Sequence, residues 1–324
     1  MKAPDTLFNY CRPINNSFFF KKFVHFGVYQ WRLFLLILLS FACPFKLSAQ
    51  DDLLKLATDS NEVTVSNLTF KATRIINGHS VETVGKNNLD FIVSHRFEQV
   101  NQGFDEFFGL DAATNRLGLE YGINDYMMVG IGRSSYEKNY DFFAKFRLLR
   151  QSIGAKNVPL SLSAFAGYAL RTNETTPELS ASERSSYTAQ LLIARKFSDA
   201  ISLQLSPTII YRNMPDFPDD SKSVFATGIG GRVKVTKRTS INGEYNYVFP
   251  NQIDDSYTNN LSFSYDIETG GHVFQLLFTN SFGMAERQFI TQTDGSWADG
   301  DIHFGFNISR TFSFAKKTKA DNEH

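Results

Sequence analysis

The chain has 324 residues with 33 basic and 33 acidic side chains, so its formal net charge at pH 7 is zero. This balance gives no reason to expect a nucleic acid as a partner, because such partners need a basic surface. Aromatic residues make up 15% of the chain, yet mean hydropathy is only −0.23 and a single long apolar run occurs, near the N-terminus. A membrane protein built from several transmembrane helices is therefore excluded.

The first 49 residues have the features of a secretory signal peptide. They carry six basic side chains against one acid, Asp5, and the apolar run Leu33–Leu39 is followed by the small residues Ser48 and Ala49. A retained membrane helix is the competing interpretation, but Pro44 interrupts the apolar stretch. The stretch is also shorter than the roughly 20 residues that span hydrocarbon. We therefore predict that residues 1–49 are a signal peptide, removed on export.

Both cysteines, Cys11 and Cys43, lie in this predicted signal peptide. The mature chain would enter an oxidising compartment without a thiol, which excludes disulfides and thiolate chemistry. Loss of the six basic residues and one acidic residue leaves 27 basic and 32 acidic side chains, a formal charge of −5.

Residues 50–87 precede the most regular part of the chain. The stretch Val63–Ile76 alternates weakly between apolar and polar residues. It is consistent with a periplasmic lead-in, with a plug, or with an additional pair of strands.

From Asn88 onwards, apolar and polar residues alternate in short segments. In the clearest one, Ile201, Leu203 and Leu205 alternate with Ser202, Gln204 and Ser206. A period of two residues is typical of a strand with one apolar and one polar face. The pattern predicts twelve strands, at about residues 88–98, 115–121, 125–133, 140–150, 159–171, 184–197, 201–209, 223–236, 241–249, 261–267, 272–281 and 302–314.

The connections between these segments alternate between long and short. Residues 172–183, 213–222, 250–258 and 282–300 are long connections, whereas 198–199, 237–238 and 268–271 are short ones. Outer-membrane barrels have long extracellular loops and tight periplasmic turns. We therefore predict an all-β, antiparallel transmembrane β-barrel of twelve strands over residues 88–314, or fourteen with a preceding pair. A polar tail, residues 315–324, would follow in the periplasm.

Several strings in the chain resemble those of a known family. They include Ile76–Thr83, Ser94–Phe97, Phe108–Asp111, Val129–Ser135, Gln190–Phe197, Gly270–Gln275 and Gly305–Arg310. Together they resemble an uncharacterised family of outer-membrane β-barrel proteins of Gram-negative bacteria, a domain of unknown function, from about residue 70 to residue 314. The resemblance implies the architecture and an outer-membrane location, and it implies no substrate, reaction or catalytic residue.

Charged and polar residues on the expected inner face are the candidate functional set. Such residues can pair across a small barrel and close it, or they can line a narrow aqueous path. The predicted lumen-lining residues are Glu120, Lys145, Arg147, Gln190, Arg212, Arg232, Lys234, Glu244, Asp266, His272 and His303.

Metal and catalytic sites have weaker support. No pair of histidines has the spacing of metal ligands on a strand or helix, so we predict no metal and no cofactor. Ser262 or Ser264 near His272 would be the starting point for a barrel-embedded hydrolase. Serine is abundant, however, so this match has little weight, and we predict that the protein is not an enzyme.

Two functions remain open at this point. The first is a channel or transport barrel for small solutes. The second is a structural or interaction barrel with a filled lumen, which acts through its loops or N-terminal segment on a periplasmic or surface protein partner. Outer-membrane lipid would surround the wall in either case, and no nucleic acid would take part.

Overall fold

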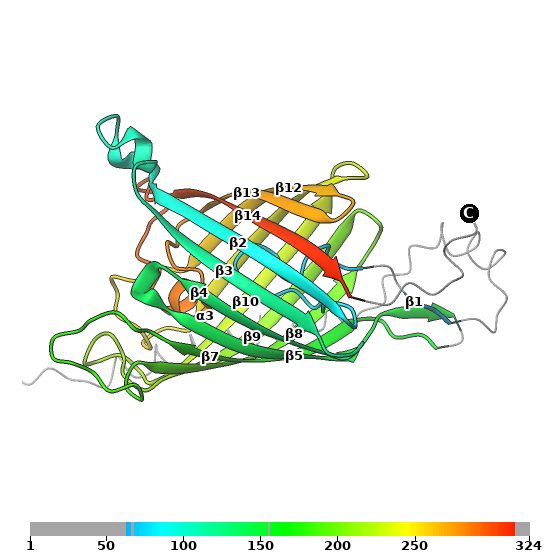
Figure 1. Ribbon diagram of the computed structural model, residues 1–324, viewed down its shortest axis with the longest axis horizontal. Helices are drawn as coiled ribbons and strands as arrows, with labels where there is room; N and C mark the ends of the chain where they lie inside the picture. The colour runs from blue at the N-terminus through cyan, green and yellow to red at the C-terminus, as the bar shows by residue number, and fades with distance from the viewer. Residues whose placement is uncertain (1–62, 66–67, 155, 315–324) are drawn as a thin grey trace, which may run out of the picture. The chain divides into compact units, whose positions relative to one another are not determined.

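The computed structural model describes residues 63–65, 68–154 and 156–314. The predicted signal peptide and the polar tail lie outside these residues. Twelve antiparallel strands form a closed barrel, as predicted (Figure 1). They are β2 (Asn88–Gln99), β3 (Ala113–Gly122), β4 (Met127–Ser134), β5 (Tyr140–Leu149), β7 (Ser161–Leu170), β8 (Ser185–Lys196), β9 (Ile201–Arg212), β10 (Ser223–Lys234), β11 (Thr239–Val248), β12 (Asn260–Thr269), β13 (His272–Thr279) and β14 (His303–Ser313).

The barrel closes where the last strand meets the first. β14 pairs antiparallel with β2, with Ile308 opposite Val93, and a register shift lies between His303 and Gly305. The other neighbours in the wall follow each other in chain order, apart from β6, which lies outside it. Closure leaves no unpaired strand edge, which is a requirement for strands that span a membrane.

Two short strands stand apart from the wall. β1 (Val63–Val65) pairs antiparallel with β6 (Ser152–Gly154), which belongs to the turn between β5 and β7. Within the described part of the chain, the alternative of fourteen wall strands is therefore wrong.

The two faces of the wall differ in polarity as the alternation predicts. On β13, Phe274, Leu276 and Phe278 are exposed on the outside, while Gln275 is buried inside. The outer face is thus an apolar belt of the kind that contacts lipid. None of the helices in the described ranges is long and apolar enough to cross a membrane.

The interior of the barrel is occupied by two parts of its own chain. The first is the segment of residues 68–87, which we call the lumen segment and which leads directly into β2. The second is α3 (Glu286–Thr291), from the long connection between β13 and β14, and all six of its residues are buried. The other helices among the described residues are the single turns η1 (Val100–Gln102), η2 (Phe107–Gly109) and η3 (Tyr136–Lys138), all outside the wall strands.

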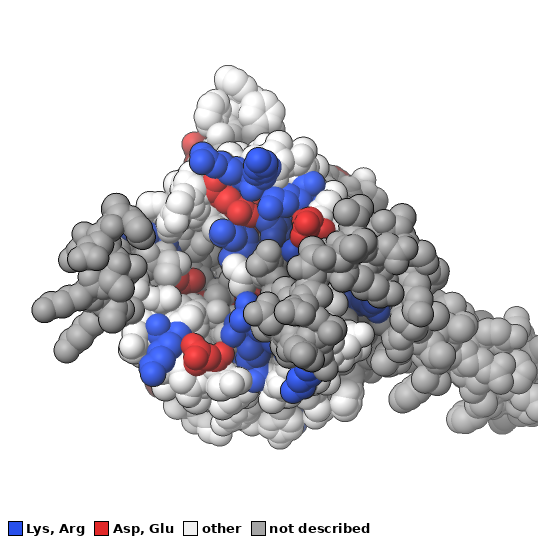
Figure 2. Space-filling model, turned by 90° about the vertical axis from the view of Figure 1, so that its right-hand side faces the viewer, with Lys and Arg blue, Asp and Glu red and all other residues white. Residues whose placement is uncertain are grey.

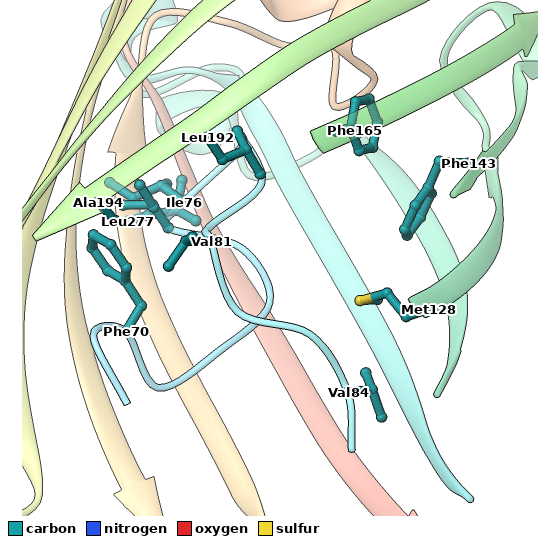
Figure 3. Close-up of a cluster of buried hydrophobic side chains, with 11 residues drawn as sticks. Phe70, Ile76, Val81, Val84, Met128, Phe143, Phe165, Leu192, Ala194 and Leu277 are labelled. Carbon is teal, nitrogen blue, oxygen red and sulfur yellow. The ribbon is translucent and has the colours of Figure 1, made fainter. Parts of the chain in front are cut away.

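Apolar packing holds both interior parts against the wall. Figure 3 shows Phe70, Ile76 and Val81 of the lumen segment in a buried cluster with wall residues such as Leu192 and Leu277. A second cluster joins α3 to the wall and consists of Phe289, Ile290, Ile210, Val224, Ala226 and Val248. Each fully buried side chain of this kind contributes about 1.5–3 kcal/mol relative to exposure.

Candidate functional site

The lumen segment reverses direction in a tight turn. Arg74 and His79 form an antiparallel bridge, and the backbone N–H of Ile75 donates to the carbonyl of Gly78 at 2.9 Å. Below this turn, Ser80 N–H donates to the carbonyl of Thr73 at 2.9 Å. The residues at the tip of the turn have no further backbone partner of this kind and depend on the wall for their hydrogen bonds.

Glu244 of β11 supplies the acceptors for this tip. Its carboxylate accepts hydrogen bonds from the backbone N–H groups of Ile76 and Asn77 at 3.1 Å and of Gly78 at 3.0 Å. The side chain of Asn246 donates a further bond at 3.1 Å. Buried backbone donors without a partner are costly, so one carboxylate satisfies three groups that would otherwise be orphaned.

Lys145 of β5 supplies the matching donor. Its Nζ donates to the carbonyls of Thr73 at 3.0 Å, Ser80 at 2.9 Å and Glu82 at 2.8 Å. The ammonium group has three donors and all three are used. The side chain of Lys145 is completely buried. Because its acceptors lie on both arms of the turn, it fixes the two arms together.

Uncharged wall side chains complete the contacts along the segment. Gln204 accepts from the N–H of Val81 and donates to the carbonyl of His79, both at 2.7 Å. Gln275 donates to the carbonyl of Ile75 at 2.8 Å, and Asn307 donates to that of Ile76 at 3.0 Å. The wall therefore binds the segment with side chains from several strands rather than by strand pairing.

A buried charge network joins the lumen segment to α3. Arg74 Nε lies 3.6 Å from Glu120 Oε1, and Arg74 Nη1 lies 3.5 Å from Glu286 Oε1. The His79 Nε2 is also 3.5 Å from Glu286 Oε1. Burial, and then the positive charges of Arg74 and Lys145, hold the pKa of His79 well below its ordinary value. His79 is therefore neutral at pH 7, and Arg74 is the cation that faces Glu286.

Ion pairs from the long loops keep α3 in the lumen. Arg287 of α3 binds Asp216 at 2.7 Å and Glu137 at 3.2 Å. Arg171 binds the same Asp216 at 3.2 Å. The loops that follow β4, β7 and β9 thus meet at α3 at the long-loop end of the barrel.

Most predicted lumen-lining residues lie in the interior. Glu120, Lys145, Gln190, Arg212, Glu244, Asp266 and His303 are buried there. Arg147 is partly buried, and its guanidinium lies 3.8 Å from the Glu82 carboxylate. Arg232 is bonded to Glu268, and Lys234 lines the cavity described below. Only some of the set, among them Glu120, Lys145 and Glu244, converge on the lumen segment.

His272 is placed differently from the prediction. It shares the outer face of β13 with Phe274, and the two rings stack with centroids 5.9 Å apart. Ser262 and Ser264 instead face the lumen, where they bond to Thr279 and Asp266 at 2.8 Å. The wall therefore separates the serines from the histidine of the suggested hydrolase, so these residues cannot form a catalytic pair.

The residues that sequence reasoning missed belong mainly to the lumen segment. Arg74, Asn77 and His79 carry much of the contact, and Asn77 also accepts from Arg96 at 2.9 Å. The string Ile76–Thr83, which carries part of the family resemblance, includes the tip of this turn but not Arg74. No group of three or more potential metal ligands occurs in the part of the chain that the structure describes.

Little space remains around the turn of the lumen segment. A cavity lined by Ile75, His79, Gln204 and Glu244, among others, has about 10 Å³, enough for one water molecule. A larger cavity of about 480 Å³ lies at the short-turn end, where basic side chains gather (Figure 2). Its lining includes Lys71, Lys196, Asp199, Arg232, Lys234 and Glu268.

A comparison with known protein families shows to which family this barrel belongs. Residues 70–312 match the family described as a membrane bound beta barrel domain (DUF5777). The chain belongs to this family. With its closed wall of twelve strands and its apolar outer belt, it is an outer-membrane β-barrel.

Solved structures of other barrels resemble it only distantly. The NanC porin is 7% identical, with 70% of this chain and 100% of that chain covered and a TM-score of 0.45. The KdgM porin is 10% identical, with 70% and 99% covered and a TM-score of 0.41. The outer membrane phospholipase A from Escherichia coli is 8% identical, with 74% and 97% covered and a TM-score of 0.42. No curated protein matches the sequence.

Proposed function

We propose that this protein is an outer-membrane channel for small solutes whose lumen segment acts as the gate. The observation that carries the proposal is the way the segment is bound. Its tip is held by Glu244 and its two arms by Lys145, and it contributes no strand to the wall. The segment can leave without breaking the barrel ladder. The wall side chains it would expose include the polar Glu244, Lys145 and Gln204 as well as apolar ones such as Leu192.

The attachment of the segment sets the direction of opening. Asn87 N–H donates to the carbonyl of Gly122 at the end of β3, so the C-terminal end of the segment is fixed at the short turn between β3 and β4. Short turns face the periplasm in outer-membrane barrels. The N-terminal part of the segment therefore moves toward the periplasm when the gate opens.

Opening must be rare without an external pull or ligand. The segment makes at least ten hydrogen bonds to wall side chains in the contacts described above, and each contributes about 0.5–1.5 kcal/mol net. Burial of Phe70, Ile76 and Val81 adds to this. The closed form is the resting state, and a periplasmic protein partner that binds the released segment would favour the open one.

A reversible disulfide tests the gate. A Cβ at Gly230 would lie 3.5 Å from Ile75 Cγ2, so cysteines at these two positions are within reach of a bond. The chain from residue 50 onwards has no cysteine to compete. In planar bilayers we expect rare, discrete openings of the wild type, none in oxidised Ile75→Cys/Gly230→Cys, and recovery on reduction.

Two outcomes would contradict the gate. Openings that persist in the oxidised variant, with the disulfide verified, would show that conduction does not require the lumen segment to move. A wild-type barrel that stays silent at every voltage would favour the second candidate, a structural or interaction barrel with a permanently filled lumen. The ion pairs of Arg287, which hold α3 in the lumen at the long-loop end, are the observation in favour of that candidate. The single variants Ile75→Cys and Gly230→Cys are the controls.

A further inference from the structure

An apolar projection follows β2 at the long-loop end of the barrel. In residues 103–111, which we call the aromatic finger, four large apolar side chains are exposed to solvent. The exposed fractions are 77% for Phe104, 53% for Phe107, 51% for Phe108 and 38% for Leu110. Figure 1 shows this loop reaching sideways, away from the barrel, at the end where α3 lies. Side chains of this size are rarely grouped on a surface that faces only water.

The finger is a folded structure and not an extended loop. Phe108 N–H donates to the carbonyl of Gly103 at 2.7 Å, and Phe107 N–H donates to that of Phe104 at 3.0 Å. The rings of Phe104 and Phe108 meet edge to face with centroids 6.2 Å apart. The rings are thus held in a fixed arrangement on the outside of the loop.

The backbone of the finger adopts strained conformations at two of its phenylalanines. Phe107 and Phe108 have φ values of 46° and 57°, which bulky residues avoid. At Gly109, φ is 80° and a Cβ would lie 2.6 Å from the carbonyl oxygen of Gln99, so only glycine fits. Strained residues of this kind tend to occur where a structure presents side chains for a purpose.

The finger continues the lipid-facing surface of the wall. It begins a few residues after Phe97, which lies on the outer side of β2 and stacks on Phe304 of β14 at 5.9 Å. Phe304 in turn contacts Phe278 of β13 at 5.4 Å. These rings form an aromatic group at the long-loop end of the apolar belt, the level at which barrels meet the membrane interface.

We propose that the aromatic finger inserts into the outer leaflet of the membrane beside the barrel and anchors its extracellular end. Asp105, Glu106 and Asp111 lie among the aromatic residues and would carry a high cost in hydrocarbon. The rings therefore enter to the depth of the boundary between headgroups and acyl chains, with the carboxylates in the headgroup layer. This inference concerns the outer surface and is independent of whether the lumen opens.

Tryptophan fluorescence tests this placement in the full chain. Both native tryptophans, Trp31 and Trp297, are replaced by Phe, and Phe104→Trp introduces a reporter at the finger without loss of an aromatic ring. Phe217→Trp is the matched control, because Phe217 is a partly exposed phenylalanine in another long loop, between β9 and β10. Each variant is placed in phosphatidylcholine vesicles that carry bromine either near the headgroup or near the end of the acyl chain.

The expected results separate lipid from the other possible occupants. The tryptophan of Phe104→Trp should show blue-shifted emission, and its fluorescence should be quenched mainly by bromine near the headgroup. The fluorescence of Phe217→Trp should instead be quenched by aqueous iodide. Quenching of Phe104→Trp by iodide alone would place the finger in water and overturn the proposal. Protection from both lipid bromine and iodide would place the finger against protein, such as a second copy of the chain, and would overturn it as well.

Discussion

Both carboxylate oxygens of Glu244 lie 3.0 Å from the backbone nitrogen of Gly78, 166 residues away in the sequence. Gly78 is at the tip of the lumen segment, and Glu244 is on β11 in the wall. A single side chain thus decides whether the tip of the segment has acceptors for its buried N–H groups. Its replacement should loosen the segment while the backbone ladder of the barrel stays intact.

The variant Glu244→Gln tests this role. An amide keeps one acceptor oxygen, and its NH₂ group repels the N–H groups that the second oxygen bound. We expect amide hydrogen exchange at Ile76–Gly78 to speed up, corresponding to a loss of about 1–3 kcal/mol in local stability. Glu183→Gln makes the same chemical change on a fully exposed loop residue and should leave this exchange rate unaltered. Equal rates in both variants would mean that the tip does not depend on Glu244.

Lys145 gives a second, independent test on the opposite side of the segment. Lys145→Met keeps the length of the side chain but leaves three buried carbonyl oxygens without their donor. We expect proteinase K to cleave the lumen segment faster in nanodiscs, where both faces of the membrane are accessible. The control is Lys237→Met, in an exposed short turn. A cleavage rate no higher than that of this control would refute the role of Lys145.

The burial of His79 makes the closed state sensitive to pH. Burial holds the pKa of His79 well below 6.5, so histidine binds a proton more readily once the segment has left the lumen. The closed state should therefore lose stability as pH falls below about 6.5. Glu286 acts in the opposite direction, because burial raises its pKa and the closed state then takes up a proton more readily.

Substitutions can separate these two effects. In Glu286→Gln the opposing contribution is absent, so channel openings should increase between about pH 7 and pH 5.5. In His79→Gln this increase should disappear, and any remaining pH dependence should come from Glu286. Single-channel recording as a function of pH is the measurement. An acid response that is unchanged in His79→Gln would rule out His79 as its origin.

The wall of the barrel could be predicted from the sequence because the pattern that marks a strand or a turn involves only neighbouring residues. The twelve strands differ from the predicted ones by only a few residues at their ends, since alternation and turn residues act over short distances. The outward position of His272, which was predicted to line the lumen, follows from the same alternation. Phe274, Leu276 and Phe278 set the outer face of β13, and a residue two positions before Phe274 shares that face.

The filling of the lumen could not be read in the same way. Lys145 and Glu244 were expected to face the interior, but their partners are backbone groups of residues 73–82, far away in the sequence. A segment of irregular backbone that is held by side chains shows no periodic pattern in its amino-acid sequence. Inward apolar residues such as Leu277 are the one local sign of the filling, because an apolar side chain that faces the lumen is normally covered by other protein groups.

Gln204 shows how the filled lumen changes an expectation about mutations. In a water-filled pore, Gln204→Arg would be tolerated. Here the side chain of Gln204 bonds Val81 and His79, so a longer, charged side chain must displace the lumen segment. We expect a folded barrel with more frequent openings in planar bilayers. Gln102→Arg, at an exposed position in a long loop, is the control, and unaltered opening in Gln204→Arg would argue against a filled lumen.

The assignment of the long loops to the cell surface has a direct test. Single cysteines at Asp219 and Asp255, in two long loops, and at Ser198 and Thr269, at short turns, all replace exposed residues. Because residues 50–324 contain no native cysteine, each variant reports on one position. A membrane-impermeant maleimide added to intact cells should label the first two and not the last two, while all four should react after lysis. Labelling of Ser198→Cys and Thr269→Cys on intact cells, with Asp219→Cys and Asp255→Cys protected, would reverse the topology. The lumen segment would then open toward the outside and not toward the periplasm.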